Sequence, residues 1–403
     1  MPLSAMDDKG SPVDWWFMYK VAGKGTKSDG GKPTGTEYVY FDANMPGSGK
    51  LVLSPDHVDQ NGALPNTLKQ VYGGAGNNKL GWFFYNDENP ITGQVVGSRG
   101  HTKGVLAFDL ASNSAFWLVQ STPKFPPKGS YSFPNTGMPN AQTLLCVTLQ
   151  DAGTSQLIAK QMFGAQQPNV YLASAVPAGM AANDPRAQLI QNKVDAATQP
   201  VDAITPFQSK GGVKFMSMAK NKTWGLDFYN DLVGPALKEN VEVETWEHAK
   251  TPQPEDSDKI HHVVDMKAVD FTKIGIPYKW PEPDDHAKLC ISDLKETVHY
   301  VCVGDMNFTL AQRKRGGGTV AFQCEPLWKS LSAVLVGVTR FPRSAATEAP
   351  PPDTGGTVGA PQPQSPARAR KASKTVAKAK TTAKRAKSAA KGRRTATKRR
   401  TRR

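Results

Sequence analysis

The chain has 403 residues and a formal net charge of +15, and its length allows a large core or two domains. Residues 1–12 lack the charged and apolar pattern of a secretory signal, and every apolar run falls short of the roughly 20 residues of a membrane-spanning helix. We therefore expect an intracellular protein with no membrane partner. Its four cysteines, none in a Cys-x-x-Cys pair, exclude a disulfide framework and favour reduced thiols: Cys146, Cys290, Cys302 and Cys324.

The first half of the chain shows mainly strand patterns. Apolar and aromatic runs predict strands over residues 13–22, 36–43, 50–54, 80–87, 103–109, 115–120 and 142–149. The strands at 36–43 and 50–54 are expected to form a hairpin, and the Gly- and Lys-rich residues 23–35 a loop. Helical patterns cover 64–74, which ends in glycine, and 155–164.

The second half begins near Pro206 and repeats this order of elements. It predicts a strand at 211–219, an amphipathic helix at 225–239 and strands at 240–246 and 297–304. Each half thus contains a helix, a strand, a loop, a strand that opens with His-x-Lys, a turn and another strand. The likeness lies in the order of elements, because the two halves share little sequence.

After residue 343 the composition changes. Residues 344–367 are rich in proline and glycine, which predicts a flexible linker. Residues 368–403 contain 17 Lys and Arg and no acid, leaving 33 basic against 35 acidic side chains in the body, a net charge of −2. This segment resembles the basic tails of linker histones and is expected to be a disordered DNA-binding tail. A cellular address or a partner-binding arm is the alternative role for such a tail.

Two His-x-Lys triplets lie 185 residues apart, at His101 with Lys103 and at His286 with Lys288. On a strand, residues i and i+2 point to the same face, so each triplet presents an imidazole and an ammonium group to one point. An imidazole can attack phosphorus or carry a proton, and an ammonium group can hold a phosphate oxygen. A single triplet occurs by chance on a half-exposed strand, but two of them at the start of strand-like runs predict one shared site.

Several longer blocks accompany these triplets in a fixed order: SPVDWWFMYK, RGHTKGVLAFD, FWLVQSTPKFP, QTLLCV, HAK, VCVGDMN and RGGGT. In this order they resemble the deoxyribonuclease II family, a branch of the phospholipase D superfamily, over roughly residues 10–340. The resemblance implies an α/β fold of two pseudo-twofold-related halves, each a mixed β-sheet flanked by helices, with the active site at their seam. We place these halves at residues 1–205 and 206–343.

The resemblance also implies an endonuclease that needs no metal or other cofactor, acts on DNA and forms a phosphohistidine intermediate, leaving 3′-phosphate and 5′-hydroxyl ends. Two alternatives remain open at this point. One is a non-catalytic, nucleoid- or chromatin-like DNA-binding protein, in which the basic tail is the functional part. The other is a phospholipase D-like phosphodiesterase that acts on another substrate.

Within the paired motifs, we assign His101 as the nucleophile and His286 as the general acid, and near-symmetry makes this assignment reversible. Lys103 and Lys288 are expected to bind the non-bridging phosphate oxygens. Asn307, in the GDMN block, is expected to orient a lysine or the phosphate, with a simple turn role as the alternative.

Further residues are assigned to substrate binding. They are Ser121 and Asp305, which follow the strand after each motif, and the cations and glycine of the RKRGGG stretch: Arg313, Arg315 and Gly317. For the glycines a plain turn is the alternative. Phe308 stands where animal family members carry a basic residue, which puts one phosphate contact in doubt. The family's animal members are disulfide-bonded, so a Cys290–Cys302 bridge also stays open.

Overall fold

The structure is a computed structural model that describes residues 2–339 except 46, 48, 74–76, 196 and 247–259. These described residues belong to one compact unit. The predicted boundary between the halves, at residue 205, falls inside strand β12 (Asp202–Gln208) and stays a prediction. The predicted linker at 344–367 and tail at 368–403 lie outside the described residues.

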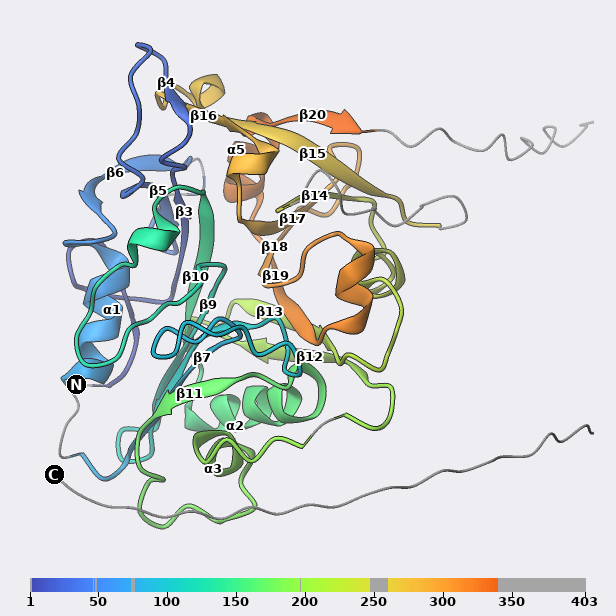
Figure 1. Ribbon diagram of the computed structural model, residues 1–403. Helices are drawn as coiled ribbons and strands as arrows, with labels where there is room; N and C mark the ends of the chain where they lie inside the picture. Colours follow the sequence, from blue (N-terminus) through green and yellow to red (C-terminus); the bar gives the residue numbers. More distant parts are fainter. Residues whose placement is uncertain are drawn as a thin grey trace, which may run out of the picture. The chain divides into compact units, whose positions relative to one another are not determined.

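One sheet has eight strands in the order β11-β7-β8-β9-β10-β3-β5-β6, and all its neighbours are antiparallel (Figure 1). Seven of its strands match those predicted in the first half, and the eighth, β11, was not predicted. The predicted hairpin is confirmed as β5 paired with β6. The bounds are β3 Trp15–Lys20, β5 Glu37–Asp42, β6 Val52–His57, β7 Leu80–Asn86, β8 Lys103–Asp109, β9 Ser114–Gln120, β10 Gln142–Leu149 and β11 Val170–Ala173.

The second sheet has the order β12-β13-β19-β18-β17-β14-β15-β16-β4, with β20 also paired to β15. Only β14 and β15 run parallel to each other. Its other strands are β4 Thr26–Lys27, β13 Lys214–Lys220, β14 Val241–Thr245, β15 Val263–Asp270, β16 Tyr278–Pro281, β17 Lys288–Ser292, β18 Tyr300–Gly304, β19 Gly317–Gln323 and β20 Leu335–Thr339. β4 comes from the loop predicted at 23–35, so the N-terminal part of the chain extends the second sheet. Strands β1 (Ala5–Met6) and β2 (Pro12–Val13) form a separate pair.

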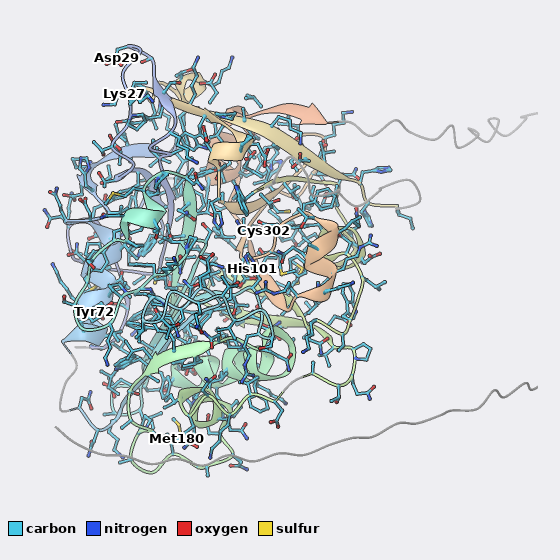
Figure 2. All side chains as sticks on the ribbon, viewed as in Figure 1. Lys27, Asp29, Tyr72, His101, Met180 and Cys302 are labelled. Carbon is cyan, nitrogen blue, oxygen red and sulfur yellow. The ribbon has the colours of Figure 1, made fainter. Side chains whose placement is uncertain are left out.

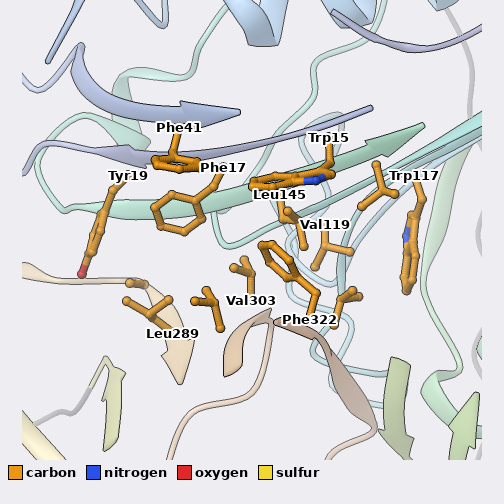
Figure 3. Packing of buried hydrophobic residues seen from close by; sticks show 14 of the residues in the cluster. Trp15, Phe17, Tyr19, Phe41, Trp117, Val119, Leu145, Leu289, Val303 and Phe322 are labelled. Atoms are coloured by element: carbon orange, nitrogen blue, oxygen red, sulfur yellow. The ribbon is translucent and has the colours of Figure 1, made fainter. Parts of the chain in front are cut away.

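The two large sheets pack face to face. Side chains alternate across β3, and its odd-numbered aromatic residues Trp15, Phe17 and Tyr19 join one cluster with buried residues of the second sheet. Figure 3 shows this layer, in which they face Leu289 and Phe322 among others. Trp16 and Met18 of β3 enter a separate cluster with helix α1 (Ala63–Tyr72) on the other side of the first sheet. The fully buried β3 therefore separates two apolar layers.

The remaining helices are α2 (Ala152–Gln161), which continues into a π-helical turn at Met162–Gln166, then α3 (Pro185–Ile190), α4 (Gly234–Leu237) and α5 (Glu325–Val334). The helix predicted at 225–239 is shorter in the structure and is not a regular α-helix. Helical backbone continues from a π-helical turn at Tyr229–Val233 directly into the single turn of α4, and Pro235 within α4 has no N–H to donate. In the part of the chain that the structure describes, no helix combines the length and apolar character needed to cross a membrane.

All four cysteines are free thiols. Cys290 of β17 and Cys302 of β18 are direct partners in the antiparallel register, and both are buried. The bridge that the resemblance left open is thus absent from the structure, although the two thiols lie opposite each other.

Candidate active site

Both His-x-Lys motifs lie at the start of a central strand. Lys103 is the first residue of β8 and Lys288 the first residue of β17, and each histidine lies two residues before it. The exposed fractions of His101 and His286 are 9% and 7%. His101 is labelled near the centre of the view in Figure 2.

Each histidine is held by the sheet to which it does not belong. The His101 ring pairs through Nδ1 with the carbonyl oxygen of Asp305, which follows β18. The His286 ring pairs through Nδ1 with the carbonyl oxygen of Ser121, which follows β9, at 3.1 Å. A carbonyl oxygen only accepts hydrogen bonds, so Nδ1 carries the hydrogen in both rings and the neutral ring keeps a lone pair on Nε2.

The backbone repeats this reciprocal arrangement. The N–H of His101 donates to the carbonyl of Gly316, which precedes β19, at 2.7 Å. The N–H of His286 donates to the carbonyl of Ala141, which precedes β10, at 2.9 Å. The structure therefore brings the two distant motifs together, with each histidine fixed at two points by the opposite sheet.

Asp87, which the sequence reasoning missed, ties the first motif to an arginine. Its carboxylate accepts from Lys103 Nζ at 2.5 Å and from Arg315 Nη2 at 2.9 Å, and its Oδ2 lies 4.0 Å from His101 Nε2. Burial opposes ionisation, but Lys103, His101 and Arg315 outweigh it and hold the pKa of Asp87 below its usual value. The sequence did hold a signal for Asp87. This carboxylate directly follows the aromatic strand β7, whose last residue pairs with Lys103 at the start of β8.

The second motif has different partners. Lys288 Nζ lies 3.4 Å from His286 Nδ1 and donates to the carbonyls of His286 and Ala287 at 2.6 and 3.1 Å. Burial and the neighbouring Lys103 hold the pKa of Lys288 well below its usual value. The indole of Trp246 lies 5.1 Å from the His286 ring, between centroids. The Lys288 ammonium is thus bound by carbonyl oxygens, in contrast to the carboxylate that binds Lys103.

Asp285 fixes the backbone of the second motif. Its side chain accepts from the Ala287 N–H at 2.7 Å, from Trp280 Nε1 at 2.7 Å and from the Tyr19 hydroxyl. Tyr19 belongs to β3 of the first sheet, so this carboxyl also crosses between the sheets. Sequence reasoning did not single out Asp285, although it directly precedes His286.

Both imidazoles are difficult to protonate in the free protein. Burial and the Lys103 ammonium lower the pKa of His101 to about 3. Burial and Lys288 hold the pKa of His286 well below its usual value, and Lys103 and His101 add to this effect. Charged groups of the first motif therefore lower the pKa of the histidine in the second. Both imidazole rings are neutral near pH 7.

Two predicted residues of the GDMN block are buried, and one of them contacts the first motif. Asp305 supplies the carbonyl that holds His101, and its carboxyl group accepts from the Gly318 N–H at 2.7 Å. Burial raises the pKa of Asp305 to about 8. Asn307 is buried, and its Oδ1 has no hydrogen-bond partner.

The other predicted substrate-binding residues are spread around the motifs. Ser121 contributes its carbonyl to His286, while its hydroxyl donates to Gln142 Oε1 at 2.6 Å. Gly317 opens β19 and has no space for a side chain, because a Cβ would lie 2.2 Å from Met306 Sδ. The Arg315 guanidinium reaches Asp87, whereas that of Arg313 acts on the buried Asp227 carboxyl outside the motifs.

The described residues include no group of three or more His, Cys, Asp or Glu side chains that could hold a metal ion. Of the other histidines, His57 bonds Thr36 through Nδ1 at 2.7 Å and His299 stacks on Trp328 at 3.8 Å between ring centroids. His248 lies outside the described residues.

A cavity of about 600 Å³ lies elsewhere, lined by Tyr72, Trp82 and Leu172 among others. None of its lining residues belongs to the His-x-Lys site, and Tyr72 is well separated from His101 in Figure 2. We expect the active site at the His-x-Lys motifs and not in this cavity, because the candidate catalytic side chains lie in the motifs.

Comparison with known proteins shows the family of this chain. The family model described as deoxyribonuclease II matches residues 4–340. A putative deoxyribonuclease-2 of Burkholderia pseudomallei (strain K96243) is 44% identical over 343 residues, covering 82% of this chain and 92% of the relative. The deoxyribonuclease-2-alpha of Rattus norvegicus is 33% identical over 342 residues, covering 83% and 93%. The chain therefore belongs to the deoxyribonuclease II family.

Proposed function

We propose that this protein is a DNA endonuclease that cleaves phosphodiester bonds through a phosphohistidine, without a metal ion, and leaves 3′-phosphate and 5′-hydroxyl ends. The observation that carries this proposal is the reciprocal pairing of the two motifs. Each supplies one lysine and one imidazole whose neutral form keeps a lone pair on Nε2, and each is held by the opposite sheet. At His101, Lys103 Nζ lies 3.4 Å from this Nε2. The names of the relatives support DNA as the substrate.

In the first step, Nε2 of one neutral imidazole attacks phosphorus. The N–P bond forms while the bond from phosphorus to the 5′ oxygen breaks, and the second imidazole, protonated, gives its proton to the leaving oxygen. We assign attack to His101 and treat the assignment as reversible, because burial and neighbouring cations hold the pKa of both rings below its usual value. His286 is then the general acid.

In the second step, water hydrolyses the phosphohistidine. The now neutral His286 takes a proton from this water, whose oxygen attacks phosphorus and releases His101 with a 3′-phosphate. The released His101 retains its Nδ1 hydrogen bond to the Asp305 carbonyl, so the ring is ready for another cycle. After the step His286 carries the proton that the next leaving oxygen needs.

The lysines would stabilise charge on the non-bridging oxygens during both steps. Lys103 is already oriented by Asp87, whereas Lys288 is bound by backbone carbonyls and would turn toward a phosphate. The unpartnered Oδ1 of Asn307 is available to accept a hydrogen bond from a lysine that has moved in this way. Arg315, Ser121 and Gly317 would shape the surroundings of the phosphate.

We also propose that the two halves are related by a pseudo-twofold axis. The order β7-β8-β9-β10-β3 in one sheet follows the same chain order, with the same antiparallel directions, as β14-β17-β18-β19-β13 in the other. The histidine contacts correspond as well, because Ser121 and Asp305 each follow the strand after a motif, and Ala141 and Gly316 each precede the strand after that. Such an axis would place both motifs at the seam.

The test is plasmid cleavage by wild type, His101→Ala, His286→Ala and the double variant. Each single variant should lose about 10²- to 10⁴-fold in cleavage rate, the contribution typical of a general acid or base. The double variant should be about as inactive as the singles, because both rings act in one cycle. His57→Ala, which alters a histidine bonded to Thr36, serves as the control and should cleave normally.

A single variant that keeps most of its activity would overturn the shared site. A wild type that binds DNA without cutting it would instead support an architectural role. Trapping the intermediate in acid-free conditions and locating the phosphate at residue 101 or 286 decides the nucleophile.

A further inference from the structure

Two lysines are completely buried outside the His-x-Lys motifs. Lys20 is the last residue of β3 and Lys220 the last residue of β13, and neither side chain is exposed. Burial lowers the pKa of Lys20 to about 7 and that of Lys220 to about 8. A buried ammonium group costs free energy unless all its hydrogens are bound, so these positions need an explanation.

Each ammonium group has three backbone carbonyl acceptors, one for each of its hydrogens. Lys20 Nζ donates to the carbonyls of Val21, Gly35 and Met138 at 2.9, 3.0 and 3.0 Å. Each carbonyl belongs to a different part of the chain, so the lysine fastens the loop around residue 138 to the end of β3.

Lys220 makes the same kind of contact. Its Nζ donates to the carbonyls of Gln312, Arg313 and Arg315 at 2.8, 3.3 and 2.6 Å. These residues form the 3-10 turn at Leu310–Lys314 and its exit, which carries Arg315 to Asp87. The lysine thus fastens this turn to the end of β13.

The strand register connects both lysines to the catalytic histidines. Lys20 pairs with Gln142 and Lys220 pairs with Gly317, the first residues of β10 and β19. The residue before Gln142 is Ala141, whose carbonyl accepts the His286 N–H, and the residue before Gly317 is Gly316, whose carbonyl accepts the His101 N–H. Each lysine therefore anchors the segment that ends in the backbone acceptor of one histidine.

We propose that Lys20 and Lys220 are positioning residues for the reaction, Lys20 for His286 and Lys220 for His101, each acting from the opposite sheet. This inference rests on the proposed function for its catalytic consequence. Without the ammonium group, three carbonyls converge with no donor between them, and the segment relaxes to reach water or other donors. The histidine attached to it then moves, and displacements of about 1 Å at a reacting group can cost about 10²-fold in rate.

The test compares Lys20→Gln with Lys220→Gln, each of which serves as the control for the other. Amide hydrogen exchange is followed for His101 and His286, and kcat and KM are measured for DNA cleavage. Lys220→Gln should speed exchange at His101 by about tenfold or more and leave His286 unchanged, and Lys20→Gln should do the reverse. Both should lower kcat by roughly ten- to a hundredfold with little change in KM.

Exchange does not depend on activity, so this part of the test stands even if the proposed reaction is wrong. If each variant changed amide exchange equally at both histidines, or at neither, the assignment of Lys20 to His286 and of Lys220 to His101 would be wrong. If exchange changed as expected but kcat stayed normal, the two lysines would have no role in the reaction. If a glutamine variant does not fold, the methionine variant of similar length replaces it. Failure of both to fold would also overturn the proposal, because the lysine would then determine folding and not histidine placement.

Discussion

At the scale of single residues, the site is a pair of neutral imidazoles among cations. Lys103, Lys288 and Arg315 all lie close enough to disfavour a further positive charge on the rings, and Asp87 offsets only part of this effect at His101. A phosphodiester brings one negative charge to this cluster. Substrate binding would therefore raise the pKa of both rings and supply the proton that the leaving oxygen needs.

This electrostatic arrangement predicts that the rate of DNA cleavage rises as the pH falls. The pKa of His286 in the free protein lies well below 6.5, so only a small fraction of molecules carries its proton near pH 7. That fraction grows tenfold for each unit by which the pH falls, until the pH reaches the pKa, while His101 stays neutral down to about pH 3.

We therefore expect kcat/KM to increase by up to about tenfold per unit from about pH 7 to about pH 5, since kcat/KM reports the protonation of free enzyme. The measurement is initial cleavage rate at low DNA concentration and constant ionic strength. A profile that is flat or falls toward acid would contradict the assignment of a buried imidazole as general acid.

At the scale of elements, the sequence predicted most strands and the motifs that open β8 and β17, because these features depend on local alternation and spacing. It did not reveal Asp87, Asp285, Lys20 or Lys220. Their roles depend on strand register and on contacts between segments far apart in the chain. The hydrogen bond from Tyr19 to Asp285, for example, joins residues 266 positions apart. The helix predicted at 225–239 is present over fewer residues, and its apolar spacing did not reveal the π-helical turn at Tyr229–Val233.

The face-to-face packing of the sheets makes its own prediction. The Phe322 ring of β19 lies 4.9 Å from the rings of Trp15 and Phe215, between centroids, and is 1% exposed. Phe322→Ala should lower the free energy of unfolding by about 3–5 kcal/mol, the usual cost of a large cavity. Denaturant unfolding measures this change, and Ile204→Ala, at a side chain 47% exposed, should cost far less. Similar costs for both variants would mean that the layer between the sheets is not the main core.

At the scale of the whole molecule, the charge is divided between a body of net charge −2 and a tail with 17 cations at 368–403. The tail lies outside the described residues, so its role is argued from charge. Cations on a flexible segment can neutralise phosphates without a fixed geometry, whereas the proposed catalytic residues lie in the body. We therefore expect the tail to supply affinity and the body to supply chemistry.

Truncation after residue 350 tests this division. If the tail contacts about 6 to 10 phosphates, DNA affinity of the full chain should fall by roughly 10³ to 10⁵ between about 50 and 200 mM salt. The truncated chain should show a much weaker salt dependence, with cleavage at saturating DNA retained. Binding is measured with His101→Ala in both chains so that the DNA is not consumed. Equal affinities and equal salt slopes would exclude the tail as a tether.

The central claim is that two histidines and two lysines cleave DNA without a metal ion. The most direct measurement is cleavage of double-stranded DNA by metal-stripped protein in EDTA, with analysis of the new ends and His101→Ala in parallel. We expect full cleavage in EDTA, 3′-phosphate and 5′-hydroxyl ends, and almost none with His101→Ala. Loss of cleavage in EDTA that magnesium restores, or ends with a 5′-phosphate, would contradict the account.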